Sequence, residues 1–226
     1  VDRAELPAIV VLGVIWMAVP LILFPVAQQW INSSLAGMLN GAVPLFTAGF
    51  AIVLLRRLPG GRLAWGLFVG FVGVLVVALP GGGEGESTAV GIILVLAATA
   101  LYGLSSNLAV PLQQRNGALP ILLRAQLVAL VVVAPYGLAS VPGSSWSWSS
   151  AGAIMALGAL GTAFAFVAMA TLLGRVGATR ASISIYFIPL VAVVLGVVLR
   201  DETVSRVSLG GVVLVLAGAA LASRRE

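Results

Sequence analysis

The strongest constraint on the fold of this chain is a series of eight apolar segments separated by short polar connections. The segments cover about residues 8–28, 35–55, 63–80, 89–110, 119–140, 151–173, 181–199 and 207–222. A helix of about 20 predominantly apolar residues crosses the hydrocarbon core of a bilayer, and most of these segments are close to that length. The sequence therefore predicts an all-α polytopic membrane protein with eight transmembrane helices.

Composition supports this class and excludes several functions. Hydrophobic residues make up 61% of the chain and charged residues 8%, whereas roughly a quarter of residues are charged in soluble proteins. The chain has no Cys and no His, which excludes disulfides, thiolate metal sites and histidine catalysis. We expect no metal, no cofactor and no enzyme activity. The net charge of +5 comes from arginines that flank apolar spans, so the expected partner is the lipid bilayer and not nucleic acid.

The arginines also predict an orientation. If the spans alternate in direction, ten of the 12 basic residues lie on one side and only Arg200 and Arg206 on the other. Short loops rich in Arg are retained in the cytoplasm. We therefore expect both ends of the chain in the cytoplasm and the loops around Glu84 and Trp146 outside. Every basic residue is Arg, which is typical of a GC-rich bacterial genome and favours a bacterial cytoplasmic membrane.

Features of the first half of the chain recur 145 residues later. The matching pairs are Pro44 with Pro189, Gly66 with Gly211, Gly73 with Gly218 and Gly13 with Gly158. A proline inside a span and packing glycines that recur in register are typical of internal transporter repeats. We interpret residues 1–80 as the last three helices of a first repeat, 81–87 as an outer loop and 88–226 as a five-helix second repeat.

This division predicts that two amino-terminal helices of the first repeat are missing from the chain. The complete protein would then have ten helices in two five-helix halves. An odd number of spans in each half turns the second copy upside down relative to the first, which gives an inverted repeat.

Specific motifs in the second repeat carry a family resemblance. They are Gly161-Thr162, the run from Gly177 to Ser182, Pro189, Glu202, the spacing from Gly210-Gly211 to Gly218, and Leu123-Arg124 near the start of the fifth span. In these features the chain resembles an EamA-domain protein of the drug/metabolite transporter superfamily. One departure is that the first repeat has Arg57 where the second has Glu202. The resemblance implies a ten-helix transporter that moves small metabolites or drugs, often outward, through a central cavity between its halves.

Polar residues within the spans are the candidates for that cavity, because such groups are costly in lipid and usually face a cavity or a partner. The candidate residues are Trp16, Asn40, Tyr102, Asn107, Arg124, Gln126, Thr162 and Tyr186. Asn40 and Tyr186 lie about one turn before Pro44 and Pro189, which are expected to kink their helices and to face protein.

Structural alternatives exist for several candidates. Ser and Thr hydroxyls can bond to their own helix, and the long side chain of Arg124 can reach the headgroups instead of contacting an anionic substrate. The glycine face of Gly66, Gly70 and Gly73, like that of Gly158 and Gly161, suits helix packing within the chain or a homodimer.

The expected function is therefore a secondary transporter that exports a small-molecule solute by alternating access between two inverted halves. No Asp or Glu falls inside a span, so no coupling group is visible and facilitated diffusion or exchange stays open. The alternative is a non-transporting, truncated or structural membrane protein.

Overall fold

The computed structural model describes residues 2–55, 61–78, 89–143 and 145–223, and these residues form helices and no strand. The predicted outer loop 81–87, with Glu84, lies outside the described residues, as does Arg57.

Eight apolar helical spans are present within the described residues. Five are long enough to cross a membrane: Arg3–Ala27, Ser33–Leu54, Ala89–Asn116, Ala118–Gly143 and Trp148–Val176. Three shorter apolar helices cover Ala64–Val77, Ile188–Arg200 and Arg206–Ala222. Each coincides with one of the eight predicted segments, so the all-α polytopic membrane fold is confirmed.

Several spans consist of more than one helical segment. The first four spans contain η1 (Arg3–Glu5), α1 (Leu6–Leu12), η2 (Gly13–Ala18) and α2 (Val19–Ala27), then α3 (Ser33–Asn40) and α4 (Val43–Leu55), then α5 (Gly61–Ala78), then α6 (Ala89–Asn116). The last four contain α7 (Ala118–Ser140) and η3 (Val141–Gly143), then α8 (Trp148–Ala156), η4 (Leu157–Phe164) and α9 (Ala165–Val176), then α10 (Ala178–Ala181), η5 (Ser182–Tyr186) and α11 (Phe187–Arg200), then α12 (Arg206–Ser223).

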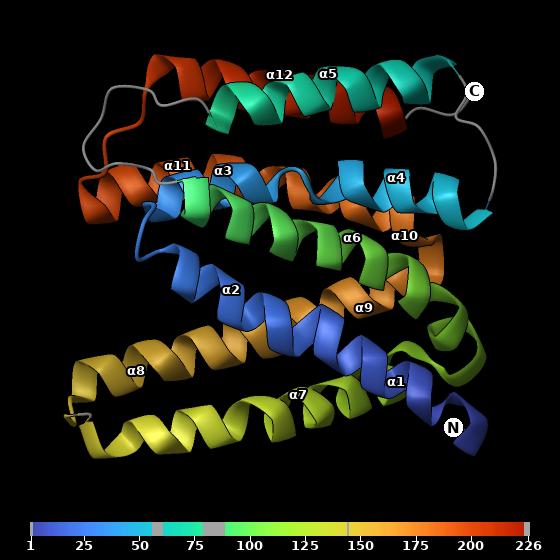
Figure 1. Ribbon diagram of the computed structural model, residues 1–226, viewed down its shortest axis with the longest axis vertical. Coiled ribbons are helices and arrows are strands. Elements are labelled where there is room, and N and C mark those ends of the chain that lie inside the picture. Colours follow the sequence, from blue (N-terminus) through green and yellow to red (C-terminus); the bar gives the residue numbers. More distant parts are fainter. Residues whose placement is uncertain (1, 56–60, 79–88, 144, 224–226) are drawn as a thin grey trace.

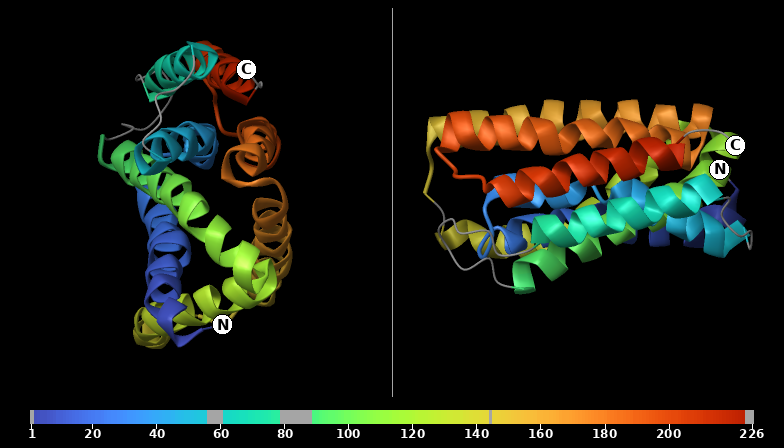
Figure 2. Two further views of the ribbon diagram at one scale, coloured as in Figure 1. Left: turned by 90° about the vertical axis from the view of Figure 1, so that its right-hand side faces the viewer. Right: turned by 90° about the horizontal axis from the view of Figure 1, so that it is seen from above.

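Corresponding spans of the two sequence repeats run in opposite directions. In Figure 1 the span α1–α2 runs against α8–α9, α3–α4 runs against α10–α11, and α5 runs against α12. The packing follows the same symmetry, since α3 contacts α11, α4 contacts α10 and η5, and α5 lies along α12. Figure 2 shows α5 and α12 side by side at one edge of the bundle. An inverted repeat produces this antiparallel arrangement.

Glycines set the close approach of α5 and α12. A Cβ atom added to Gly66 would lie 2.6 Å from the carbonyl oxygen of Gly218, and one added to Gly73 would lie 2.9 Å from that of Gly211. The 145-residue offset equates Gly66 with Gly211 and Gly73 with Gly218. One contact is therefore the two-fold copy of the other, and this glycine face is used within the chain.

The second predicted glycine face is open. A Cβ added to Gly158 would meet nothing within 4 Å, and one added to Gly161 would meet only Leu157 of the same segment. A homodimer through glycine-rich faces stays a prediction, and this is the face that it would use.

Two π-helical segments, which the sequence did not lead us to expect, also obey the repeat. They are η2 and η4, and residues 13–18 of the first correspond to 158–163 of the second at the same offset. Such segments are often found at functional sites. Here η2 carries Trp16, and α9 begins directly after η4.

The structure corrects the expected positions of Pro44 and Pro189 within their helices. Pro44 lies in the first turn of α4, after an interruption in which the N–H of Ala42 donates to the carbonyl of Leu39 at 2.9 Å. Pro189 lies in the first turn of α11, directly after η5. Each α-helix thus begins within two residues before its proline, and a bend of the span at these points stays a prediction. Both prolines are buried, so the interruptions face protein.

The interior contains two apolar clusters, one at each end of the long axis of Figure 1. The first joins α1, α7 and α9 through residues such as Leu12, Ile121 and Leu173, and it also includes residues of η2 and α6. The second joins α3, α5 and α12 through residues such as Leu39, Val77 and Val215.

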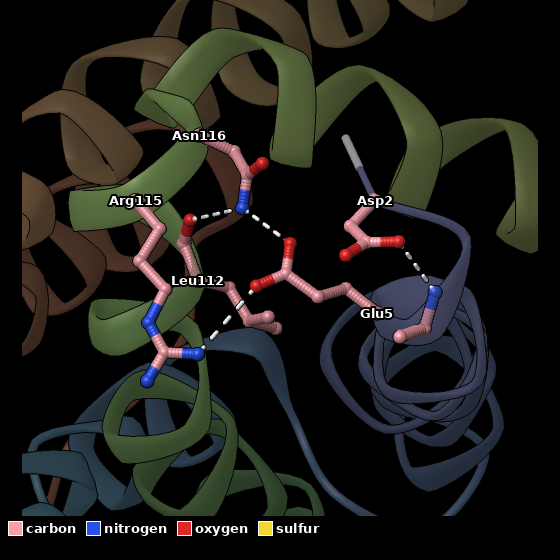
Figure 3. Close-up of polar contacts among 6 residues, drawn as sticks. Asp2, Glu5, Leu112, Arg115 and Asn116 are labelled. Atoms are coloured by element: carbon pink, nitrogen blue, oxygen red, sulfur yellow. Dashed lines mark hydrogen bonds and ion pairs between the residues drawn. The ribbon is translucent and has the colours of Figure 1, made fainter.

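The first helix begins and the last helix ends at the same end of the helix bundle, which is the right-hand side of Figure 1 (see also Figure 2). Figure 3 shows how the amino-terminal segment is held there: Glu5 Oε1 lies 3.6 Å from Arg115 Nη1, and Glu5 Oε2 accepts a hydrogen bond from Asn116 Nδ2 at 2.6 Å. Asp2 caps η1 by accepting from the N–H of Ala4 at 3.1 Å.

Candidate functional site

A cavity of about 320 Å³ lies between spans of both repeats. Its described lining residues are Trp16, Asn40, Val43, Tyr102, Ser106, Ala165, Phe166, Met169, Ser184, Ile185 and Ile188. These residues occupy the middle stretches of their spans. The cavity therefore lies near the middle of these spans, and transporter repeats commonly place a substrate near the centre of the bilayer.

Aromatic rings form much of its wall. Trp16, which is 3% exposed, meets Phe166 edge to face with 6.0 Å between ring centroids. Tyr102 stacks on Phe24 at 6.1 Å. Such pairs present rigid apolar surface and a small number of polar atoms.

Asn40 contributes to this cavity a polar atom that has no partner among the described residues. It ends α3, just before Pro44, and its Oδ1 is buried without a hydrogen bond to any described residue. Leaving a buried acceptor unpaired costs about 1–3 kcal/mol. A ligand that donates a hydrogen bond to Asn40 would remove this cost.

The two serines of the cavity follow the structural alternative. Ser106 Oγ donates to the carbonyl of Tyr102 at 2.8 Å, and Ser184 Oγ donates to that of Ala181 at 2.8 Å. Both hydroxyl groups therefore satisfy the backbone of their own helices.

Two other predicted residues lie away from the cavity with partners of their own. Asn107 Nδ2 donates to the carbonyls of Thr47 and Gly103, each at 2.9 Å, and so joins α6 to α4. Arg124 Nη1 donates to the carbonyl of Pro120 at 3.0 Å, near the start of α7. In this position Arg124 fits the headgroup alternative better than a substrate contact.

The remaining predicted residues do not contribute to the described cavity. Gln126 in α7 and Thr162 in η4 are half-buried, but neither lines it. The side chain of Tyr186 lies outside the described part of the structure, although its backbone ends η5. The structure thus brings together Trp16, Asn40 and Tyr102, whose role in substrate binding stays a prediction.

Apolar residues that polarity could not reveal complete the lining. Ile185 and Ile188 line the cavity and stand 145 positions after Asn40 and Val43, which also line it. Applying the repeat offset to Asn40 would therefore have found Ile185 from the sequence.

A second polar cluster joins the repeats at the end of the bundle opposite the termini. Glu202, between α11 and α12, accepts hydrogen bonds from the N–H groups of Ser33 at 3.2 Å and Ser34 at 2.8 Å, and from the hydroxyl of Ser33. Burial alone would raise the pKa of Glu202, but these hydrogen bonds outweigh it and hold the pKa below its usual value.

Membrane-spanning helices in antiparallel pairs around a cavity at mid-depth define a polytopic membrane protein built like a transporter. The family model described as "EamA-like transporter family" matches residues 2–79 and 89–224. The chain belongs to this family, which confirms the resemblance found in the sequence and supports a transport role in general terms.

Two further comparisons agree with this assignment. A protein of Archaeoglobus fulgidus described as an uncharacterized transporter is 23% identical over 222 residues, which cover 98% of this chain and 79% of that protein. A solved crystal structure has the same fold, with a TM-score of 0.67 and 20% identity over 95% of this chain and 75% of the other.

Proposed function

We propose that this chain acts as a secondary transporter that carries small uncharged organic solutes through the central cavity. The observation that carries the proposal is the Oδ1 of Asn40, which has no partner among the described residues and lies in a cavity walled mainly by apolar and aromatic side chains. The hydroxyls of Ser106 and Ser184 in the same lining are already bonded to their own backbone. Membership of a transporter family supports transport in general, and the chemistry of the lining supports the solute class.

The lining favours a solute with an apolar or aromatic body and at least one hydrogen-bond donor. Trp16, Tyr102 and Phe166 offer flat apolar surface, while Asn40 offers an acceptor. No Asp, Glu or Arg is present among the described lining residues. Moving a charged solute into this cavity without a partner of opposite charge would be energetically unfavourable. Uncharged metabolites or drugs therefore fit best.

Alternating access between the two inverted halves is the proposed mechanism. Toward the end opposite the termini, α3 of the first repeat packs on α11 of the second, where Gly41 meets Pro189 and Gly37 meets Ala192. Separating these helices would open the cavity toward that end. Separating α4 from α10 and η5 would open it toward the other.

We further propose a bacterial cytoplasmic membrane as the location, with the end that carries both termini inside and transport directed outward. The distribution of arginines supports the orientation, and the family resemblance supports the direction.

Counterflow in proteoliposomes tests the proposal. Vesicles containing the purified full chain are preloaded with an unlabelled uncharged aromatic amide, and uptake of the labelled amide is compared with that of the matching aromatic carboxylate. We expect transient accumulation of the amide and much less of the carboxylate. Accumulation of neither would favour the alternative of a structural membrane protein, and preference for the carboxylate would contradict the proposed solute class.

A further inference from the structure

A second cavity, of about 500 Å³, lies at the end of the bundle that carries the termini. It is formed where α6 ends, α7 begins and α9 ends. Its described lining residues are Gln113, Gln114, Gly117, Ala118, Leu119, Pro120, Thr171, Gly174 and Arg175. We propose that this cavity is an oxyanion site that binds a phosphate group, separate from the central cavity.

Gln113 is the first observation that points to a ligand. This residue is 3% exposed and lines the cavity, and neither its Nε2 nor its Oε1 has a hydrogen-bond partner among the described residues. Buried amides are nearly always paired, so an amide with both ends free indicates a missing partner. On the facing helix, a Cβ added to Gly174 would lie 3.5 Å from Gln113 Oε1. The glycine therefore leaves room beside the amide.

The start of α7 is the second observation. This 23-residue helix has Gly117 as its N-cap, with φ of 85°, and no side chain caps it. The first N–H groups of a helix have no partner within it and carry its positive dipole end, which favours anions. The N–H groups of Ala118 and Leu119 are therefore available beside the buried amide.

Arg175 is the third observation, because it adds a full positive charge to the lining of this cavity. It lies in the last turn of α9, lines the cavity and is exposed. Among the described residues no acidic side chain pairs with it, whereas nearby Arg115 is engaged by Glu5 (Figure 3). A guanidinium, an amide N–H₂ and backbone N–H groups are all donors, and the planar guanidinium matches the oxygens of a phosphate. This donor set would suit a phosphate at the membrane surface, either in an anionic lipid headgroup or as a free anion.

Two binding measurements on the full chain distinguish these sources. In the first, inorganic phosphate is titrated into protein in a nonionic detergent without added lipid, and thermal stability is recorded, since a ligand that binds the folded state raises it. In the second, stability is compared in nanodiscs of phosphatidylcholine with and without phosphatidylglycerol. Arg175→Gln and Gln113→Leu are the test variants. Arg3→Gln is the control, because it removes one exposed charge at the same end of the bundle but not in the cavity.

We expect phosphate, phosphatidylglycerol or both to raise the thermal stability of the wild-type protein. The apparent affinity for that ligand should be weaker by about tenfold or more in both test variants and unchanged in the control. A response to phosphate identifies a free anion as a ligand, and a response to phosphatidylglycerol alone identifies the headgroup. Gly174→Val narrows the cavity without changing charge and should act like Gln113→Leu, which keeps the test intact if one variant fails to fold. No stabilisation in either arm, or an equal loss in Arg3→Gln, would overturn the site.

Discussion

Glu202 accepts a hydrogen bond of 2.8 Å from the backbone N–H of Ser34, which joins the two segments that we interpret as repeats. Together with the contacts to Ser33, this bond places a carboxylate at the amino-terminal end of α3. The negative charge satisfies N–H groups that have no helical partner and interacts favourably with the helix dipole. At the 145-residue offset Glu202 corresponds to Arg57, so the first half has no matching acid. Glu202 thus caps a helix of the other half.

Replacing Glu202 with Gln should destabilise the protein by about 1–2 kcal/mol, because the charge-assisted bonds to α3 become neutral or are lost. Thermal unfolding in detergent measures the effect. Asp201→Asn is the matched control: it removes the neighbouring charge and tolerates the positive φ of 52° at that position. Equal losses in both variants would contradict a specific role for the cap.

The contribution of Glu202 should also depend on pH. Its pKa is lowered in the folded state, so folding favours the ionised form. The resulting stability is complete above the ordinary carboxyl pKa of about 4.3 and is lost as the pH falls through the lower pKa of the folded state. The difference in melting temperature between wild type and Glu202→Gln should therefore be largest near neutral pH and shrink at acid pH. A difference in melting temperature that does not shrink at acid pH would contradict this prediction.

Adjacent glycines in α12 should respond very differently to alanine. A Cβ at Gly211 would lie 2.7 Å from the backbone nitrogen of Val77, whereas a Cβ at Gly210 would meet nothing within 4 Å. Gly211→Ala should cost about 1–3 kcal/mol through overpacking against backbone. Gly210→Ala should be neutral or stabilising by up to about 1 kcal/mol, because alanine favours helix. Thermal unfolding of the pair tests the close packing of α5 and α12.

Asn40→Leu should reduce counterflow of the uncharged amide about tenfold or more without lowering thermal stability, because the variant removes an acceptor that has no partner within the described structure. Gln126→Leu, a matched change outside the cavity, should leave transport close to wild type. If Asn40→Leu transports normally, Asn40 does not contact the solute.

Orientation can be tested on a clean background, because the chain has no Cys. Single cysteines at Arg3 and Ser145, both exposed and at opposite ends of the bundle, are probed in intact cells with a membrane-impermeant maleimide. We expect labelling at Ser145→Cys, and at Arg3→Cys only after the cells are opened. The reverse pattern would invert the proposed topology.

The spans could be predicted from sequence because bilayer thickness imposes a minimum length of apolar residues that hydropathy detects directly. The interruptions at η2, η4 and the two prolines could not, because they depend on how each span packs against its neighbours. Trp16 and Asn40 illustrate the difference: the sequence marks both as unusual in a span, but only packing places them on one cavity.

Asn107 and Ile185 show why the site was only partly predicted. Asn107 has the polarity expected of a cavity residue, but its Nδ2 donates its hydrogen bonds to backbone carbonyls of α4 and α6. Ile185 lines the cavity, but its side chain is as apolar as that of a lipid-facing residue, so only the repeat offset from Asn40 could have pointed to it. Polarity reports which groups need a partner, and it does not reveal where that partner lies.

The glycine contacts between α5 and α12 limit how the two halves can move. Because the helices touch backbone to backbone at two symmetric points, neither can slide along the other without collision. In the proposed alternating access, this edge would stay closed and act as a hinge about which the remaining helices turn.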